Sequence, residues 1–119
     1  MSTIKVGTLL HSDGSTTTQP SIPALAPVMA RVWCKWHQNN HVIDGSYGVS
    51  SITDTGVGFT RVTFSTALSS GNHATVLSDD NYGNSFVSSH GPTTVDCADM
   101  NQGSTGYADA LMNVVVFGS

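Results

Sequence analysis

From residue 28 onward, the chain consists of short segments in which apolar and polar residues alternate, separated by turn-forming residues at intervals of about ten positions. Two sets of side chains alternate along residues 28–36: Arg31, Trp33 and Lys35 on one face, and Val32, Cys34 and Trp36 on the other. The predicted strands are residues 28–36, 47–53, 58–66, 73–78, 86–90, 93–98 and 110–117. About seven strands at this spacing predict an all-β fold, an antiparallel, jelly-roll-like β-sandwich.

The charged residues exclude the main alternatives to this fold. Only 10% of the 119 residues are charged, all eight acidic residues are Asp, and Lys and Arg together number four. Without Glu, the chain has almost nothing from which to build amphipathic helices. Four scattered cations in a chain of net charge −4 also form no basic surface for nucleic acid. The longest stretch that leans apolar, residues 22–30, is too short for membrane insertion and is interrupted by Pro23 and Pro27.

The first 27 residues differ from the rest and are predicted to form an extended attachment arm. A turn at residues 11–15 and a polar run at residues 16–19 precede Pro20, Pro23 and Pro27, which favour an extended chain. We therefore expect two parts: an arm at residues 1–27, ordered by a partner surface, and a β-sandwich at residues 28–119.

The last predicted strand is apolar on both faces. Residues 114–117 read Val-Val-Val-Phe, whereas the strand around Arg61 alternates. A strand buried on both sides needs a covering layer on each side. The second layer is either the other sheet or a neighbouring subunit.

Cys34 and Cys97 both fall in predicted strands. No secretory signal precedes them, which favours two buried free thiols, although a disulfide is possible if their strands face each other. The absence of a C-x-x-C spacing argues against zinc and redox motifs.

No catalytic motif stands out, and we expect a protein that is not an enzyme and uses no cofactor. The G-x-S-x-G elbow of hydrolases is absent, and the glycines at residues 56 and 58 lack the third glycine of a phosphate loop. Asp13, Asp44 and Asp80 lie beside Gly or Asn, where aspartate favours turns, so an arbitrary pair of carboxyl groups is no sign of catalysis.

Two segments carry residues that could bind a metal, but for both we favour a simpler structure. His37 and His41 are four positions apart, but they follow a strand and flank two Asn, which predicts a solvated loop at residues 37–41. Residues 79–84 read D-D-N-Y-G-N, similar to a calcium loop without its closing Glu, and we interpret them as a plain turn. No metal site is therefore predicted.

The candidate binding residues are mainly aromatic. Trp33 and Trp36 lie on opposite faces of one strand, so only one of them can face the core. The other either lies in a subunit interface or stacks on a sugar ring. The residues predicted to contact a glycan are Trp33, Asn39, Asn40, Tyr47 and Tyr82.

Four segments resemble structural proteins of tailed bacteriophages, especially those of marine phages and cyanophages. The segment YGVSSITDTGVGFTRVTFSTAL at residues 47–68 is similar to their N-V-S-S-I-T-D-N-G strand, Gly turn and alternating T-V-N-F strand. In the same order, ARVWCKWH at residues 30–37 resembles their A-W-V-N-F strand, and ALMNVVVFGS at residues 110–119 resembles their closing strand. The opening STIKVGTLLHSDGST, residues 2–16, is similar to theirs.

This resemblance implies a virion protein: a β-rich tail-fibre domain, homotrimeric and active in host-surface attachment. We therefore expect a small tail-fibre or tail-tip protein whose partners are its own copies, other virion proteins bound through the arm, and a host-surface glycan. Because no long shaft precedes the β domain, a capsid decoration (cement) protein is the alternative. A carbohydrate-binding module is a third possibility, which the resemblance disfavours.

Overall fold

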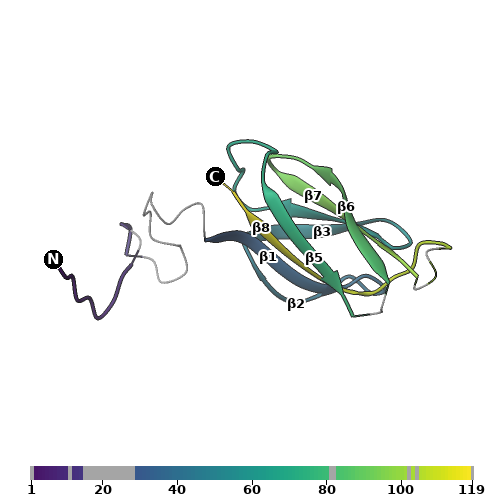
Figure 1. Ribbon diagram of the computed structural model, residues 1–119, viewed down its shortest axis with the longest axis horizontal. Coiled ribbons are helices and arrows are strands. Elements are labelled where there is room, and N and C mark those ends of the chain that lie inside the picture. Colours follow the sequence, from purple (N-terminus) through teal and green to yellow (C-terminus); the bar gives the residue numbers. More distant parts are fainter. Residues whose placement is uncertain are drawn as a thin grey trace.

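The computed structural model describes residues 2–10, 12–14, 29–80, 83–101, 103 and 105–118. Eight strands in them form two antiparallel sheets of four, stacked face to face (Figure 1). The strands are β1 (Ala30–His37), β2 (Val42–Tyr47), β3 (Val49–Gly56), β4 (Phe59–Phe64), β5 (Ala74–Asp79), β6 (Asn84–His90), β7 (Thr94–Met100) and β8 (Leu111–Phe117). Sheet A has the order β2-β1-β8-β5 and sheet B the order β3-β4-β7-β6. The prediction of an all-β fold with two antiparallel sheets is confirmed.

The strand that the sequence did not predict is β2. Asp44 and Gly45 fall between the first two predicted strands and have a sequence typical of a turn, but they lie inside an edge strand of sheet A. Lys35 pairs with Gly45 and Trp36 pairs with Ile43, so Asp44 is an extra residue, a β-bulge. Most of β2 is exposed, and this edge strand therefore shows no alternation of apolar and polar residues.

The predicted strand at residues 47–53 is divided by Gly48. Tyr47 ends β2 in sheet A, and Val49 begins β3 in sheet B. Gly48 has a φ of 71°, and a Cβ on it would lie 2.6 Å from the carbonyl oxygen of Arg31. Glycine is therefore needed where the chain crosses between the sheets.

The strand order is not that of a jelly roll, in which the second strand lies beside the seventh. Here β2 lies beside β1, and β7 lies between β4 and β6. The hairpins β1–β2, β3–β4 and β6–β7 each remain within one sheet, and the other four connections carry the chain between sheets. The expected jelly-roll likeness is therefore wrong in its connectivity.

The core lies between the two sheets and follows the predicted alternation of β1. Val32, Cys34 and Trp36 are buried, whereas Trp33 and Lys35 are exposed. The buried cluster is completed by Val62, Phe64, Leu68, Val95, Cys97, Ala110, Met112, Val114 and Val116.

Both cysteines are buried in this core and free, as the sequence favoured. Burial raises the pKa of the Cys34 thiol to about 11. Burial, together with the charge of Asp96 and the nearby Cys34, raises the pKa of Cys97 to about 12.

The closing strand β8 is covered on its inner side by sheet B. Met112, Val114 and Val116 point inward and are buried. Its outward residues are only half-buried: Leu111, Asn113, Val115 and Phe117. The other sheet thus supplies one of the two expected layers, and within this chain the outer face of β8 remains partly open.

The segment predicted as a solvated loop contains a buried side chain. β1 extends to His37, and the next residue, Gln38, is buried. Its Nε2 donates to Thr60 Oγ1 (3.3 Å), and its Oε1 accepts from the backbone N–H of Ala110 (3.0 Å). Gln38 therefore connects β1 with β4 and with the start of β8, and only Asn39 and Asn40 are the exposed loop residues that the sequence predicted.

The described residues of the predicted arm, 2–10 and 12–14, are exposed and belong to neither sheet. Figure 1 shows residues 2–10 beyond one end of the sandwich. The remainder of the predicted arm, including its three prolines, lies outside the described residues.

Candidate functional site

The outer face of sheet A carries a row of apolar side chains that crosses all four strands. Trp33 pairs with Tyr47 on one side and with Val115 on the other, and Val115 pairs with Val76. Residues directly opposite each other in antiparallel strands project from the same face. Tyr47, Trp33, Val115 and Val76 therefore form one continuous line, which we call the sheet A row. Trp33 is 41% exposed and Val76 is 59% exposed.

Because Gly45 has no side chain, the Trp33 ring can lie against the backbone of β2. A Cβ on Gly45 would lie 3.3 Å from two carbon atoms of the Trp33 ring, which therefore covers the backbone of β2. The ring is held on one side by β2, while part of its surface stays open to solvent. Such an arrangement presents a fixed aromatic surface, the geometry needed for stacking against a planar or apolar partner.

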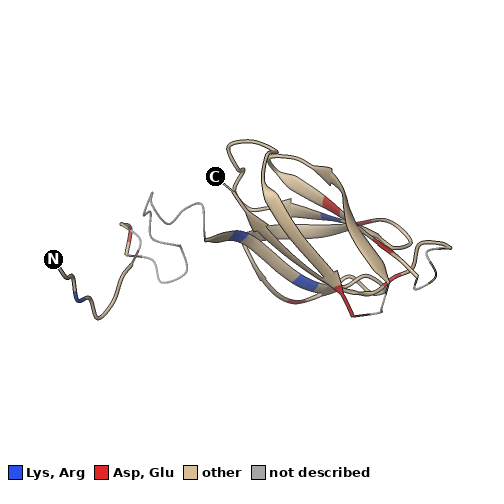
Figure 2. Ribbon diagram, viewed as in Figure 1, with Lys and Arg blue, Asp and Glu red and all other residues tan. Residues whose placement is uncertain are grey.

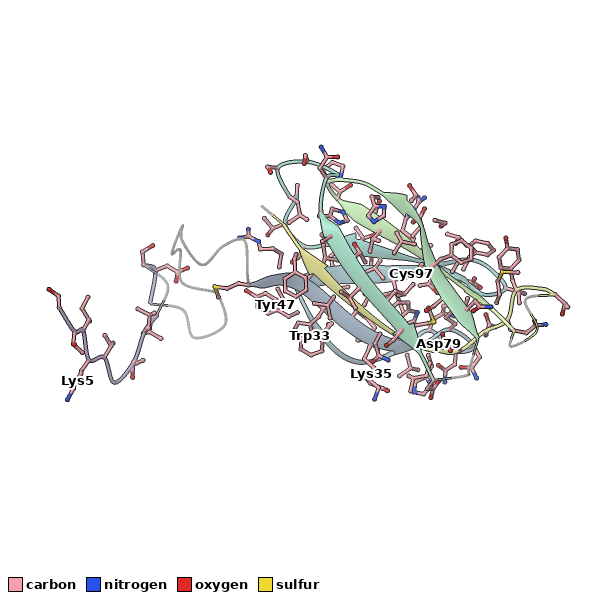
Figure 3. All side chains as sticks on the ribbon, viewed as in Figure 1. Lys5, Trp33, Lys35, Tyr47, Asp79 and Cys97 are labelled. Atoms are coloured by element: carbon pink, nitrogen blue, oxygen red, sulfur yellow. The ribbon has the colours of Figure 1, made fainter. Side chains whose placement is uncertain are left out.

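Polar groups flank the aromatic end of the row. Lys35 follows Trp33 on the same face of β1 and is exposed, and its partner on β8 is Asn113. Figure 3 shows Tyr47, Trp33 and Lys35 on the sheet A side of the molecule. Ser78 continues this line on β5 as the partner of Asn113. The site thus combines two aromatic rings with an ammonium group, an amide and a hydroxyl.

The corresponding central row of sheet B is polar. Thr53 pairs with Arg61, Arg61 with Asp96, and Asp96 with Ser89. Arg61 donates to Asp96 through Nε (2.7 Å) and Nη2 (2.9 Å), and this partner raises the pKa of the guanidinium. An exposed ion pair of this kind is well solvated. The two outer faces therefore differ, and sheet A has the apolar central row.

The structure brings together two of the five residues predicted to contact a glycan. Trp33 and Tyr47 are direct cross-strand partners. Asn39 and Asn40 lie in the β1–β2 turn, where Asn40 Oδ1 accepts from Val42 N (3.2 Å). Four residues of strand, roughly 13 Å, separate Trp33 from the end of β1, so both Asn lie away from the aromatic pair. Tyr82 lies outside the described residues.

The sequence analysis missed the residues that accompany this pair, which are Gly45, Lys35 and Asn113. Their association depends on the register of β1 with β2 and β8. With β2 interpreted as a turn, no register was available to place Gly45 beneath Trp33. The alternation in β1 did, however, place Lys35 on the same face as Trp33.

The two histidines weighed as metal ligands instead have acidic partners. His37 Nε2 lies 3.1 Å from Asp44 Oδ2, and His41 Nε2 lies 3.5 Å from Asp54 Oδ2. Within the residues that the structure describes, no three His, Cys, Asp or Glu side chains converge as a metal site.

A second set of exposed apolar side chains lies in the N-terminal segment. Ile4 is 87% exposed, and Val6, Leu9 and Leu10 are also open to solvent. Together with the sheet A row, they give the chain two separate apolar surfaces.

Comparisons of this chain with protein-family models, with curated proteins and with solved structures find no match. In the part of the chain that the structure describes, no helix is long and apolar enough to cross a membrane.

Proposed function

We propose that this chain is a non-enzymatic structural component of a phage virion, a small tail-fibre or tail-tip protein that binds a host-surface glycan through the sheet A row. The resemblance of four ordered segments to phage structural proteins supports the virion role. The observation that carries the glycan role is the pairing of Trp33 with Tyr47 on an open face of sheet A.

In this proposal, the sugar stacks on the Trp33 ring and Tyr47 extends the aromatic surface. The apolar face of a pyranose covers the exposed part of the indole, while its hydroxyl groups bond to Lys35 Nζ and the Asn113 amide. This arrangement is typical of ligand sites, in which an apolar surface supplies affinity and a few polar groups set orientation. Asn39 and Asn40 have no part in it because they lie at the end of the hairpin.

The test is binding of the purified full-length protein to a glycan array, followed by titration of the best ligand. Trp33→Ala should weaken binding about tenfold or more, because truncation of a central aromatic anchor commonly costs over 1 to 2 kcal/mol. Val57→Ala is the matched control, since Val57 is also an exposed apolar side chain but lies in the β3–β4 turn. Circular dichroism of each variant verifies the fold. Absence of binding at millimolar glycan, or equal losses in both variants, would contradict the proposal.

A capsid decoration protein is the second candidate, and the length of the sheet A row favours it. The row continues past the aromatic pair to Val115 and Val76, across the full width of the sheet. A protein partner could cover this whole line, and the exposed Ile4 and Val6 offer a second contact. Immunogold labelling of intact virions distinguishes the two roles: label on the tail supports the tail-fibre role, and label on the capsid supports decoration.

We also propose that the protein is a homotrimer and that residues 1–27 attach it to other virion proteins. The resemblance implies the trimer, and the partly open outer face of β8 is compatible with it. Sedimentation equilibrium should give three times the monomer mass of 12.4 kDa, and a stable monomer would contradict the trimer. Deletion of residues 1–27 should leave a folded sandwich that no longer joins virions, and continued incorporation would contradict the arm's role.

A further inference from the structure

Each sheet has two edge strands, and β5 differs from the other three because its pairing is regular. The edges are β2 and β5 in sheet A and β3 and β6 in sheet B. The registers of β2, β3 and β6 with their neighbours are each interrupted by a bulge or other irregularity. In contrast, β5 pairs with β8 over Ala74–Asp79 without interruption. Bulges are one way in which edge strands avoid pairing with other chains, so β5 is the edge that lacks this protection.

The sequence of β5 also lacks the prolines, lysines and central charges that often protect an edge strand. It reads Ala-Thr-Val-Leu-Ser-Asp, and only its last residue is charged. Figure 2 shows no charged residue on β5 before the acidic residues at its end. In the part of the chain that the structure describes, β8 is the one strand paired with β5. The other side of β5 can therefore accept a further strand through main-chain N–H and C=O groups.

Apolar side chains next to this edge are incompletely buried. Leu77 lies on the inward side of β5, and Val87 lies on β6, the edge strand of sheet B that contacts β5. Both pack against the core cluster, but neither is fully buried. A strand added beside β5 with apolar residues on its inward face would bury more of this surface, and removal of apolar surface from water is favourable.

Residues 2–10 have the pattern of such a strand. In an extended segment, Ile4 and Val6 share one face with Thr8 and Leu10, whereas the residues between them lie on the other face. In the structure these residues belong to neither sheet, and Ile4 and Val6 are 87% and 59% exposed. Figure 1 shows residues 2–10 beyond one end of the sandwich, away from β5 of the same chain. Their apolar face is therefore available to a neighbouring molecule.

We propose that residues 2–10 of one copy bind as an added strand at the β5 edge of a neighbouring copy. Ile4 and Val6 face inward and cover Leu77 and Val87 of the accepting copy. Main-chain hydrogen bonds supply affinity, and the alternate side chains supply specificity, as in other complexes formed by strand addition.

Charge favours the same pairing and indicates its register. Lys5 is the one charged side chain in residues 2–10, whereas β5 ends at Asp79 and is followed by Asp80. Asp80 is exposed. A register that places Lys5 outward beside Ser78 brings its ammonium group toward these carboxyl groups, and opposite charges across an interface help to fix its register.

This contact is heterologous, because a segment of one copy meets a different surface of the next. Heterologous contacts close into a ring when the rotation between copies allows it, so three such contacts can join three copies. The strand exchange rests on the proposed homotrimer and adds to it: residues 2–10 hold the copies together, and attachment to other virion proteins is left to the rest of the arm.

Sedimentation equilibrium of the full-length protein and two variants tests the donated segment. Val6→Asp places a charge on its apolar face and should reduce the mass from three times 12.4 kDa to the monomer mass. Leu9→Asp is the matched control and should leave the trimer intact, because Leu9 is 60% exposed, like Val6, but lies on the opposite face of the segment. Both residues lie outside the two sheets, and circular dichroism verifies that each variant is folded.

Disulfide trapping tests the accepting edge. Lys5→Cys and Ser78→Cys proteins are prepared separately, mixed and oxidised, so that a linked heterodimer forms only between copies. The native cysteines are buried in the core and should not take part. Lys5→Cys mixed with Ser51→Cys is the control and should give no link, because Ser51 is an exposed residue of another edge strand, β3.

The outcomes separate the strand exchange from the trimer itself. A trimer in Val6→Asp, an equal loss in Leu9→Asp, or no link to Ser78→Cys beyond that to Ser51→Cys would overturn the strand exchange and leave a trimeric wild type unexplained by it. A monomeric wild type would contradict the homotrimer and the strand exchange together.

Discussion

Replacement of Gln38 by Ala should destabilise the sandwich by about 3–4 kcal/mol. The substitution removes the bond to Thr60 and leaves the buried N–H of Ala110 without its acceptor. An unpaired buried donor costs about 1–3 kcal/mol. The removed atoms also leave a cavity of roughly 50 Å³, which adds about 1.2 kcal/mol at ~24 cal/mol per Å³. Gln38→Met fills the same space and should therefore cost only the hydrogen-bond part, about 1–3 kcal/mol.

Urea unfolding followed by tryptophan fluorescence measures these free energies of unfolding. A double-mutant cycle with Thr60→Val isolates the Gln38–Thr60 bond, for which we expect a coupling of about 0.5–1.5 kcal/mol. A cost below about 1 kcal/mol for Gln38→Ala would refute the reasoning, because an exposed glutamine in a solvated loop behaves in that way.

Three other predictions follow from the backbone, the thiols and the buried acid. Gly48→Ala should cost at least about 2 kcal/mol in urea unfolding, since glycine there has a φ of 71° and a crowded Cβ position, whereas Gly106→Ala, in open space, should change stability by less than about 0.5 kcal/mol. Cys34 and Cys97 should resist Ellman's reagent at pH 8 until the protein is unfolded in urea, because burial raises both pKa values; rapid native labelling would contradict this. The pKa of Asp99 rises on folding from 3.8 to about 6, so the folded state holds the proton more tightly than the unfolded state. The contribution of Asp99 to stability therefore falls as the pH rises from about 4 to about 6. Asp99→Asn should remove this part of the decline in Tm, and an unchanged pH profile would contradict it.

The sequence predicted the elements that alternate between buried and exposed faces. The β1 pattern is an example: its even-numbered positions, such as Val32 and Trp36, are buried. The edge strand β2 has little buried surface, so hydrophobic spacing could not reveal it, and its Asp44 and Gly45 resembled a turn.

The candidate site could be predicted only in part because it depends on strand register. Trp33 and Tyr47 were chosen as aromatic residues, but only the β1–β2 register makes them neighbours. Asn39 was chosen for its position in the chain, yet the length of β1 takes it away from the ring. Asp96 and Asp99 lie three positions apart on β7, so alternation puts them on opposite faces, but the predicted strand ended at residue 98 and did not include the buried Asp99.

The width of the sheet A row provides a test that distinguishes a sugar ligand from a protein partner. Tyr47 and Val76 lie on opposite edge strands, three strand spacings or roughly 14 Å apart. A sugar stacked on Trp33 would not reach Val76, whereas a protein that covers the sheet would bury both. Val76→Ser should therefore leave glycan affinity unchanged, while it weakens any assembly contact made by this face. The two measurements are glycan titration and the sedimentation of the assembled protein. A loss of glycan affinity in Val76→Ser as large as that in Trp33→Ala would show that the aromatic pair alone does not form the binding surface.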